Sequence, residues 1–317
     1  MLRKTAKKVP DETCPYRGFI YTQNFNGMSV KDKQLKSLLD PPVDIMISKG
    51  NMTYCVQETW VVGNTVIMVR GHMIFLHNRF EREEGNKGSN PRGVTIILSP
   101  TAVVDWKEDG SNPPITTHFY SKFVGIFVRI KISFPRFDKW GKIVSGFLKL
   151  FVASIYHPVN NKEHGEFNET LKSLVSSLPK TVQFIGGHDV NANLSMRKLM
   201  HKRVNRIYGL KNHNKKGQNL LGIFGANNLR VVNRFFKKRN YTTCRYFNKS
   251  RPPHVLDVIT CSTSFFRFVN DCIKIPDGVQ SNHSVVWMVF LNRSIKFKSD
   301  YIERPVVDWK NIKKFQN

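Results

Sequence analysis

Four short polar clusters, each inside or at the end of an apolar β-like run, constrain the fold of this chain most. In chain order they are Gln57-Glu58-Thr59, Asp189-Val190-Asn191, Leu256-Asp257-Val258-Ile259 and Ser281-Asn282-His283-Ser284. Residues so far apart in the sequence can meet only if the strands that carry them end at one rim of a sheet. The clusters therefore predict a β-rich fold in which several strand ends build one polar site.

Helical signals lie between the apolar runs. A helix is expected from Ser29 to about Leu39, where Pro41-Pro42 would end it. Another is expected from Glu166 to Leu178, because its apolar residues recur at helical spacing, and a third at 218–227. Strands are expected at 18–23, 53–57, 65–69, 73–76, 94–98, 123–132, 149–156, 181–185, 229–233, 255–260 and 284–291. Many short strands with helices between them favour an α/β fold of layered sheets covered by helices.

The formal net charge of +27 points to a polyanionic partner. Nucleic acid is favoured because cations that contact phosphates release counterions, and an anionic membrane surface is the alternative. The stretch from Met196 to Arg251 contains no Asp or Glu. We expect it to form a basic rim for DNA beside the site, with contacts from Arg197, Lys198, Lys202, Arg203, Lys237, Lys238, Arg239 and Arg245.

Cysteine usage and the chain ends bear on location and domains. The 5 cysteines are odd in number and widely spaced, without zinc-type pairs, which favours reduced thiols in an intracellular protein. No stretch has the pattern of a signal peptide or a transmembrane segment, so we expect no membrane association. We predict a flexible basic tail at 1–17, one catalytic domain at 18–293 and a polar tail or linker at 294–317.

The residue types in the clusters suit phosphodiester hydrolysis. Glu58 follows a strand and is a natural ligand for Mg²⁺, which binds with only one or two protein carboxylates. Asp189 could orient or deprotonate the attacking water, and Asn191 could donate to the transition-state oxygens. His283 could donate to the phosphate, with Asp257 holding its imidazole in one tautomer.

Together these motifs resemble those of the endonuclease/exonuclease/phosphatase superfamily. In pattern they are similar to the apurinic-type endonuclease domains of LINE-like, non-LTR retrotransposons, over roughly Phe19 to Phe290. The resemblance is carried by NFNG at Asn24, QETW at Gln57, IYHP at Ile155, GGHDVNAN at Gly186, LDVI at Leu256 and SNHS at Ser281.

The resemblance implies a four-layered α/β sandwich of the deoxyribonuclease I type, with two mixed sheets flanked by helices. It implies one Mg²⁺ site, with Mn²⁺ as an alternative, near Asn24 and Glu58. Tyr156 and Asn191 would contact the phosphate, Asp189 the water, and Asp257 would pair with His283. Such domains nick target DNA and leave a 3′-hydroxyl, so the implied partners are DNA and a downstream reverse transcriptase, and the implied location is the nucleus.

Three positions depart from the family pattern. Asn282 stands where SDH has Asp, a residue that can assist the metal, so we predict weaker metal binding through a neutral amide. His188 stands at the second Gly of GGDFN, where it is either a packed histidine or a phosphate contact. Cys244 stands where the family often has Trp.

Three functions remain open from the sequence. The first is a Mg²⁺-dependent DNA endonuclease. The second is a phosphoinositide or phospholipid phosphoesterase of the same superfamily, against which the acid-free stretch argues. The third is a catalytically weakened nucleic-acid-binding module, which the change at Asn282 keeps open.

Overall fold

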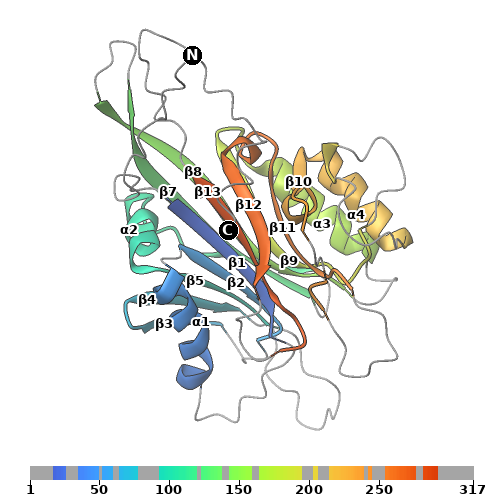
Figure 1. Cartoon of the computed structure of the whole chain (residues 1–317), viewed down its shortest axis with the longest axis horizontal. Helices are drawn as coiled ribbons and strands as arrows, with labels where there is room; N and C mark the ends of the chain where they lie inside the picture. The colour runs from blue at the N-terminus through green and yellow to red at the C-terminus, as the bar shows by residue number, and fades with distance from the viewer. Residues whose placement is uncertain are drawn as a thin grey trace, which may run out of the picture.

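Two β-sheets pack face to face and carry helices on their outer surfaces (Figure 1). This arrangement comes from a computed structural model, which describes residues 17–25, 35–49, 52–59, 64–77, 93–119, 123–137, 143–158, 164–194, 203–205, 214–238, 242–244, 254–275 and 281–291. The prediction of a layered α/β sandwich with two mixed sheets is confirmed. None of the helices in these ranges is long and apolar enough to span a membrane.

The first sheet has seven strands in the order β12-β13-β1-β2-β5-β4-β3. They are β1 (Arg17–Asn24), β2 (Thr53–Gln57), β3 (Asn64–Val69), β4 (His72–His77), β5 (Val94–Leu98), β12 (Val269–Ile275) and β13 (Val285–Leu291). β1 pairs in parallel with β2 and antiparallel with β13. The carboxyl ends of β1 and β2 therefore lie at the same edge of this sheet.

The second sheet has six strands in the order β10-β11-β9-β8-β7-β6. They are β6 (Ile115–Phe119), β7 (Phe123–Phe137), β8 (Ile143–Tyr156), β9 (Val182–Asp189), β10 (Leu229–Val231) and β11 (Asp257–Ser262). β8 and β9 are parallel, so their carboxyl ends share an edge, and β11 begins at that edge because it is antiparallel to β9.

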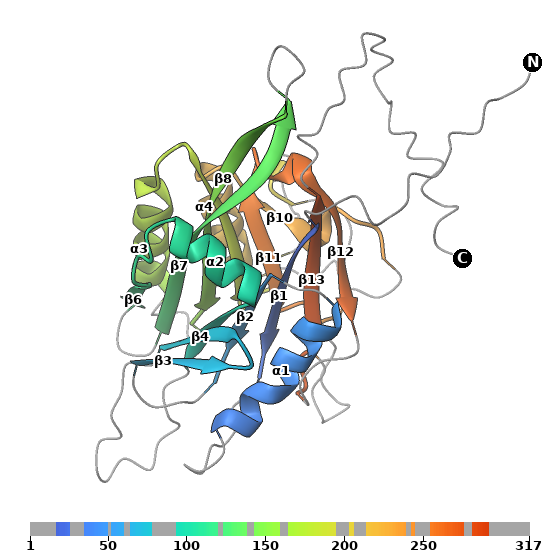
Figure 2. The same ribbon diagram turned by 90° about the vertical axis from the view of Figure 1, so that its left-hand side faces the viewer.

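Four α-helices cover the outside: α1 (Leu35–Lys49), α2 (Pro100–Glu108), α3 (His164–Ser177) and α4 (Lys215–Ala226). α1 lies on the seven-stranded sheet, whereas α3 and α4 lie together on the six-stranded one (Figure 2). The predicted helices at 166–178 and 218–227 are confirmed to within a few residues. The sequence reading missed α2, which is short and begins at Pro100, with the Ser99 side chain accepting a hydrogen bond from the Ala102 amide.

The prediction that Pro41-Pro42 ends a helix is wrong, because α1 continues through both prolines to Lys49. The proposed start at Ser29 lies outside the described residues. Each proline removes a backbone hydrogen bond at a cost of about 3 kcal/mol. Leu39, Val43 and Met46 follow one another on the helix face that packs on the sheet, and each is at most 2% exposed. Burying three such side chains contributes about 1.5–3 kcal/mol each, which offsets the two prolines.

The predicted end of a strand at Gly186-Gly187 is also wrong, since β9 continues to Asp189. Gly187 sits where the two sheets come closest. A Cβ atom there would lie 2.6 Å from the Cβ of Cys55 and 2.7 Å from the Oγ1 of Thr22, both on the opposite sheet. Glycine is therefore required by close packing rather than by a turn.

Other strands also differ from the prediction. β7 runs to Phe137, beyond the predicted 123–132, β8 begins at Ile143, before the predicted 149–156, and β6 was not anticipated. The strand expected at 229–233 ends at Val231 and is followed by a short 3-10 turn, η4 (Val232–Arg234). β12 was not anticipated, because its sequence mixes polar and apolar residues without regular alternation. The predicted tails lie outside the described residues, apart from Arg17, so the predicted domain limits stay a prediction.

Candidate active site

The register of three neighbouring strands places three predicted site residues in one row. Tyr156 of β8 is the cross-strand partner of Asp189 on β9, and Asp189 is the partner of Asp257 on β11. Directly paired residues point to the same face of a sheet, here the face that meets the other sheet. All three side chains are at most 1% exposed. The structure therefore brings these three predicted site residues side by side.

The opposite sheet supplies Asn24 and Glu58. Asn24 ends β1 beside Gln57, the last residue of β2, so that Glu58 follows at the same edge. The Asn24 side-chain amide donates to Oδ2 of Asp189 at 2.6 Å, and its backbone N–H donates to Oδ1 of Asp257 at 3.3 Å. Glu58 is 8% exposed and has a left-handed φ of 52°. A non-glycine residue in that region marks a strained position of the kind found at functional sites.

His283 forms a buried pair with Asp257. Its Nδ1 donates to the carboxylate, at 2.8 Å from Oδ2 and 3.0 Å from Oδ1. Burial alone disfavours the charged imidazolium, but the negative charges of Asp257 and Asp189 outweigh it and raise the pKa of His283 to about 12. The imidazole is therefore a cation at neutral pH, suited to donate to a phosphate.

The charges and burial around Asp189 raise its pKa as well. Burial first, and then the neighbouring carboxylates of Asp257 and Glu58, raise the pKa of Asp189 to about 7, against the opposing effects of His283 and Asn24. A carboxyl group with a pKa near neutrality can both hold and release a proton under physiological conditions, as a general base must.

Asn191 is held in place by two hydrogen bonds. Its φ of 44° is left-handed, which Asn tolerates better than most residues. Its backbone N–H donates to Oδ1 of Asp189 at 3.1 Å, and its side-chain amide donates to the carbonyl of His157 at 2.9 Å. The amide is half-buried and its orientation is fixed before any substrate arrives.

Supporting polar residues that the sequence reading did not assign connect the two sheets. Gln57 donates from Nε2 to the Ser154 hydroxyl at 3.0 Å and to the Gly187 carbonyl at 3.2 Å, on the other sheet. The Thr243 hydroxyl accepts from the backbone N–H groups of Leu256 and Asp257. Gln57 belongs to the QETW motif, which was recognised in the sequence, but the role of its side chain in connecting the two sheets was not predicted.

The three departures from the family pattern have different surroundings. His188 is fully buried on the helix side of β9, bonded to His157 at 2.9 Å and to Thr260 at 2.8 Å, so it is a packed histidine and no phosphate contact. Cys244 forms an isolated backbone bridge with His283. Asn282 is half-buried, and its side-chain Oδ1 is buried without a hydrogen-bond partner.

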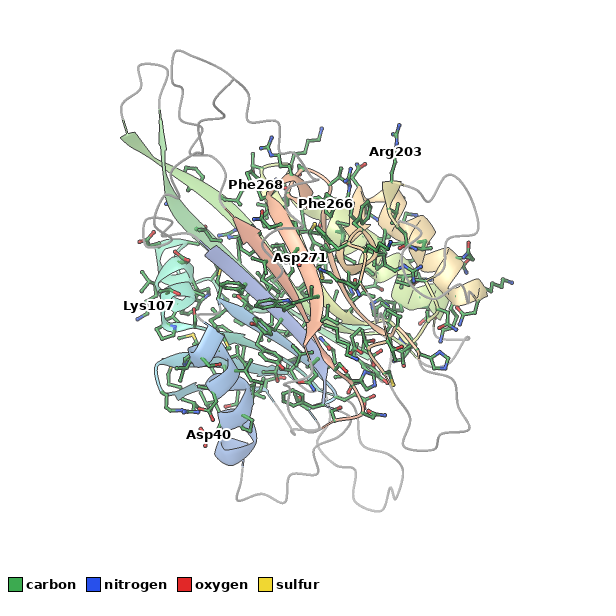
Figure 3. The ribbon with its side chains drawn as sticks, viewed as in Figure 1. Asp40, Lys107, Arg203, Phe266, Phe268 and Asp271 are labelled. Atoms are coloured by element: carbon green, nitrogen blue, oxygen red, sulfur yellow. The ribbon has the colours of Figure 1, made fainter. Side chains whose placement is uncertain are left out.

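The predicted basic rim is described only in part. Arg203 is exposed and points away from the body of the protein (Figure 3), beside the C-terminal end of α4. Lys237 is exposed, whereas Lys238 is paired with Asp271 of β12 at 2.6 Å. The remaining predicted contacts lie outside the described residues: Arg197, Lys198, Lys202, Arg239 and Arg245.

The donor set fits a hard divalent cation of the Mg²⁺ type. Among the described residues no group of three or more His, Cys, Asp and Glu is arranged as a metal cluster. Mg²⁺ does not need one, because it binds through one or two carboxylates with water and substrate oxygens. Glu58 offers a carboxylate and Asn24 and Asn282 offer amide oxygens, that of Asn282 being unpartnered. Glu58 and Asp257 also act on Asp189, where their charges add to the effect of burial and raise its pKa.

Several solved structures share this fold. No family model and no curated protein sequence matches the chain. The endonuclease domain of TRAS1, a telomere-specific non-LTR retrotransposon, is 16% identical with a TM-score of 0.50, over 88% of this chain and 99% of that one. The AP endonuclease LMAP from Leishmania major is 13% identical with a TM-score of 0.57, over 92% of each chain. The Xenopus laevis APE2 catalytic domain is 14% identical with a TM-score of 0.54, over 86% and 92%.

These structures belong to the endonuclease/exonuclease/phosphatase superfamily, and the present chain has its fold. The predicted deoxyribonuclease I-like sandwich is thus confirmed by the arrangement of both sheets and by these neighbours.

Proposed function

We propose that this protein is a Mg²⁺-dependent endonuclease that hydrolyses DNA phosphodiester bonds. The observation that carries the proposal is a hydrogen-bonded network across the two sheets. Asn24 donates to Asp189 and to Asp257, and Asp257 also accepts a hydrogen bond from His283. The nuclease neighbours, one of them a retrotransposon endonuclease domain, support the same chemistry and origin.

Each side chain has a defined task in this proposal. Mg²⁺, or Mn²⁺ in its place, would be held by Glu58, Asn24 and Asn282 and would supply positive charge to the phosphate oxygens. Asp189 accepts the proton of the attacking water, since its carboxylate is fixed by Asn24 and its pKa of about 7 suits a base.

In this proposal, three hydrogen-bond donors bind the oxygens of the phosphate. Asn191 and the Tyr156 hydroxyl donate to its oxygens, and the His283 imidazolium neutralises the charge that develops there. Attack of water on the phosphorus with departure of the 3′ oxygen breaks one strand, leaving a 3′-hydroxyl and a 5′-phosphate. Such an end can prime a reverse transcriptase, which we propose as a downstream partner, and this role implies a nuclear location.

A second function is favoured by one observation. Asn282 replaces an acidic residue of the family motif, and its amide oxygen brings no charge to the metal. A chain that binds metal too weakly would persist as a nucleic-acid-binding module, with its charge of +27 intact.

Nicking of supercoiled plasmid tests the proposal. We expect conversion to open circles with Mg²⁺, none with EDTA, and none with Glu58→Ala. Glu166→Ala is the matched control, because Glu166 is an exposed acid in the first turn of α3. Salt-sensitive DNA binding without nicking, at any Mg²⁺ or Mn²⁺ concentration, would establish the binding module. Nicking that survives in Glu58→Ala would remove Glu58 from the site.

A further inference from the structure

A two-stranded ribbon projects from the end of the six-stranded sheet that is remote from the site. β7 and β8 pair continuously from Gly125↔Ile155 to Phe137↔Ile143. β6 pairs only with the first residues of β7, up to Phe127. β9 pairs with β8 only from Lys149 onward. Among the described residues, no third strand borders the rest of the pair, which extends beyond the sheets (Figure 2).

Cations gather on one face at the base of this ribbon. Lys131 and Lys149 are direct cross-strand partners, and Arg129 is two residues from Lys131 on the same face. Asp109, at the end of α2, contacts both Arg129 and Lys149, the latter at 3.9 Å. In the described part of this face, Arg129 and Lys149 thus share one carboxylate, and Lys131 is a third cation beside them. Like charges directly opposite each other destabilise an antiparallel pair unless an anion lies between them.

An exposed aromatic ring completes the face. Phe147 is two residues from Lys149 and is 59% exposed. The Lys131 ammonium lies 5.2 Å from the centroid of the Phe147 ring. A large apolar ring next to uncompensated cations fits a partner that offers both anionic groups and flat rings. A nucleic-acid strand has both, whereas an acidic peptide would satisfy the cations and leave the ring exposed.

The sequence from Arg129 to Lys149 is rich in basic residues. From Arg129 to Lys149 the basic residues are Arg129, Lys131, Arg136, Lys139, Lys142 and Lys149, against a single acid, Asp138. An excess of positive charge along a projecting segment favours contact with several consecutive phosphates.

We propose that the face formed by Arg129, Lys131, Phe147 and Lys149 binds single-stranded nucleic acid, with phosphates at the lysines and an unpaired base on Phe147. Stacking on an exposed ring requires an unpaired base, so a single strand is favoured over a duplex. Phe147 is nine residues from Tyr156 along β8, or about 30 Å at the rise of a strand. The strand held here is therefore separate from the bond being cut.

The choice of nucleic acid rests on the proposed function, but binding at the ribbon requires no cleavage. The test is fluorescence anisotropy with a labelled oligothymidylate roughly 20 nucleotides long, several bases more than one small binding site covers. We expect Lys131→Gln/Lys149→Gln to lower the slope of log affinity against log salt by about 1.4, since each single-strand phosphate contact contributes about 0.7. Phe147→Ala should weaken binding roughly 5- to 150-fold, the range for one lost base stack.

The matched control is Lys172→Gln/Lys180→Gln, which removes the same charge from exposed positions around α3. Plasmid nicking should be unchanged in all ribbon variants, because none of these residues lies in the site. The proposal is overturned if the ribbon and control pairs weaken binding equally, if Phe147→Ala binds like the unaltered protein, or if Phe147→Ala weakens binding of a duplex of the same length as much as it weakens binding of the single strand. If nicking is absent but ribbon-dependent binding is present, the proposed function fails and this inference stands.

Discussion

Replacement of Gly187 by Ala tests whether the contact between the two sheets positions the site. The new Cβ would lie 2.6 Å from the Cβ of Cys55, 2.7 Å from the Oγ1 of Thr22 and 2.8 Å from the Cβ of Thr22. The positions of the two Cβ atoms are set by the backbone, so these atoms cannot rotate away. An ordinary contact of about 3.6 Å therefore requires the sheets to part by about 1 Å.

A gap of about 1 Å between the sheets lowers the free energy of unfolding. It removes a quarter to a half of the dispersion energy of the atoms that line it, and it stretches the bond between Gln57 and the Gly187 carbonyl. Overpacking in a filled core costs about 1–3 kcal/mol. We expect Gly187→Ala to lose about 3 kcal/mol of unfolding free energy, measured by urea denaturation. Because Asp189 is two residues away, a displacement of about 1 Å should also lower the nicking rate roughly 10²-fold.

Gly222→Ala is the matched control. Gly222 lies within α4, and a Cβ there has no heavy atom within 4 Å. The helix should gain up to about 1 kcal/mol from the same chemical change. If Gly187→Ala unfolds at the same urea concentration as the unaltered protein, the reasoning about close packing is wrong. If both variants are destabilised equally, the effect comes from the backbone and not from the sheet contact.

Three further predictions concern individual side chains. Burial lowers the pKa of His188 to about 3, so the unfolded chain takes up a proton below about pH 6.5 that the folded chain refuses. The raised pKa of Asp189 acts in the opposite direction over much of this range, so we expect the stability advantage of the unaltered protein over His188→Asn, measured by urea denaturation, to fall by about 1.4 kcal/mol per pH unit from pH 6.5 toward 3; a difference that does not change with pH would refute a neutral buried His188. Asn282→Asp should lower the Mg²⁺ concentration for half-maximal nicking several-fold, because a carboxylate replaces a neutral amide oxygen; an unchanged requirement would place Asn282 away from the metal. Asp189→Asn should lower the nicking rate by at least about 10²-fold while DNA binding, followed by anisotropy, stays within about twofold; normal cleavage would show that another group activates the water.

The sequence predicted the elements whose signal is local. The helix at 166–178 was visible because its apolar spacing and the following Pro179 agree, and the structure has α3 at His164–Ser177. The strand ends that carry the polar clusters were predictable because each cluster lies inside or beside an apolar run. The bonds between Asn24 and Asp189, and between His283 and Asp257, follow from strand register, which the motifs suggested only through a family resemblance.

Other features depend on contacts between distant residues. α1 passes through Pro41-Pro42 because its far half is buried on the sheet, which local propensity does not show. Gly187 looks like a turn residue in the sequence and is a close-packing residue in the fold. Gln57 reads as part of a metal motif, yet its side chain connects the sheets. In each case the deciding partner is on another element, so no window of sequence contains it.

The departures from the family pattern differ in what they can do to the chemistry. Successive residues of a strand point to opposite faces, so His188 lies beneath α4 while Asp189 faces the site. Both ring nitrogens of His188 are hydrogen-bonded, one to His157 and the other to Thr260. A histidine in place of the glycine of the family motif is thus accommodated in the core on the helix side of the sheet. Asn282 belongs instead to the segment that carries His283, and its Oδ1 is an unpaired buried acceptor. The pairs around Asp189 and Asp257 are intact, so under the proposed function we expect the charge at position 282 to decide chiefly whether the site cleaves DNA or only binds it.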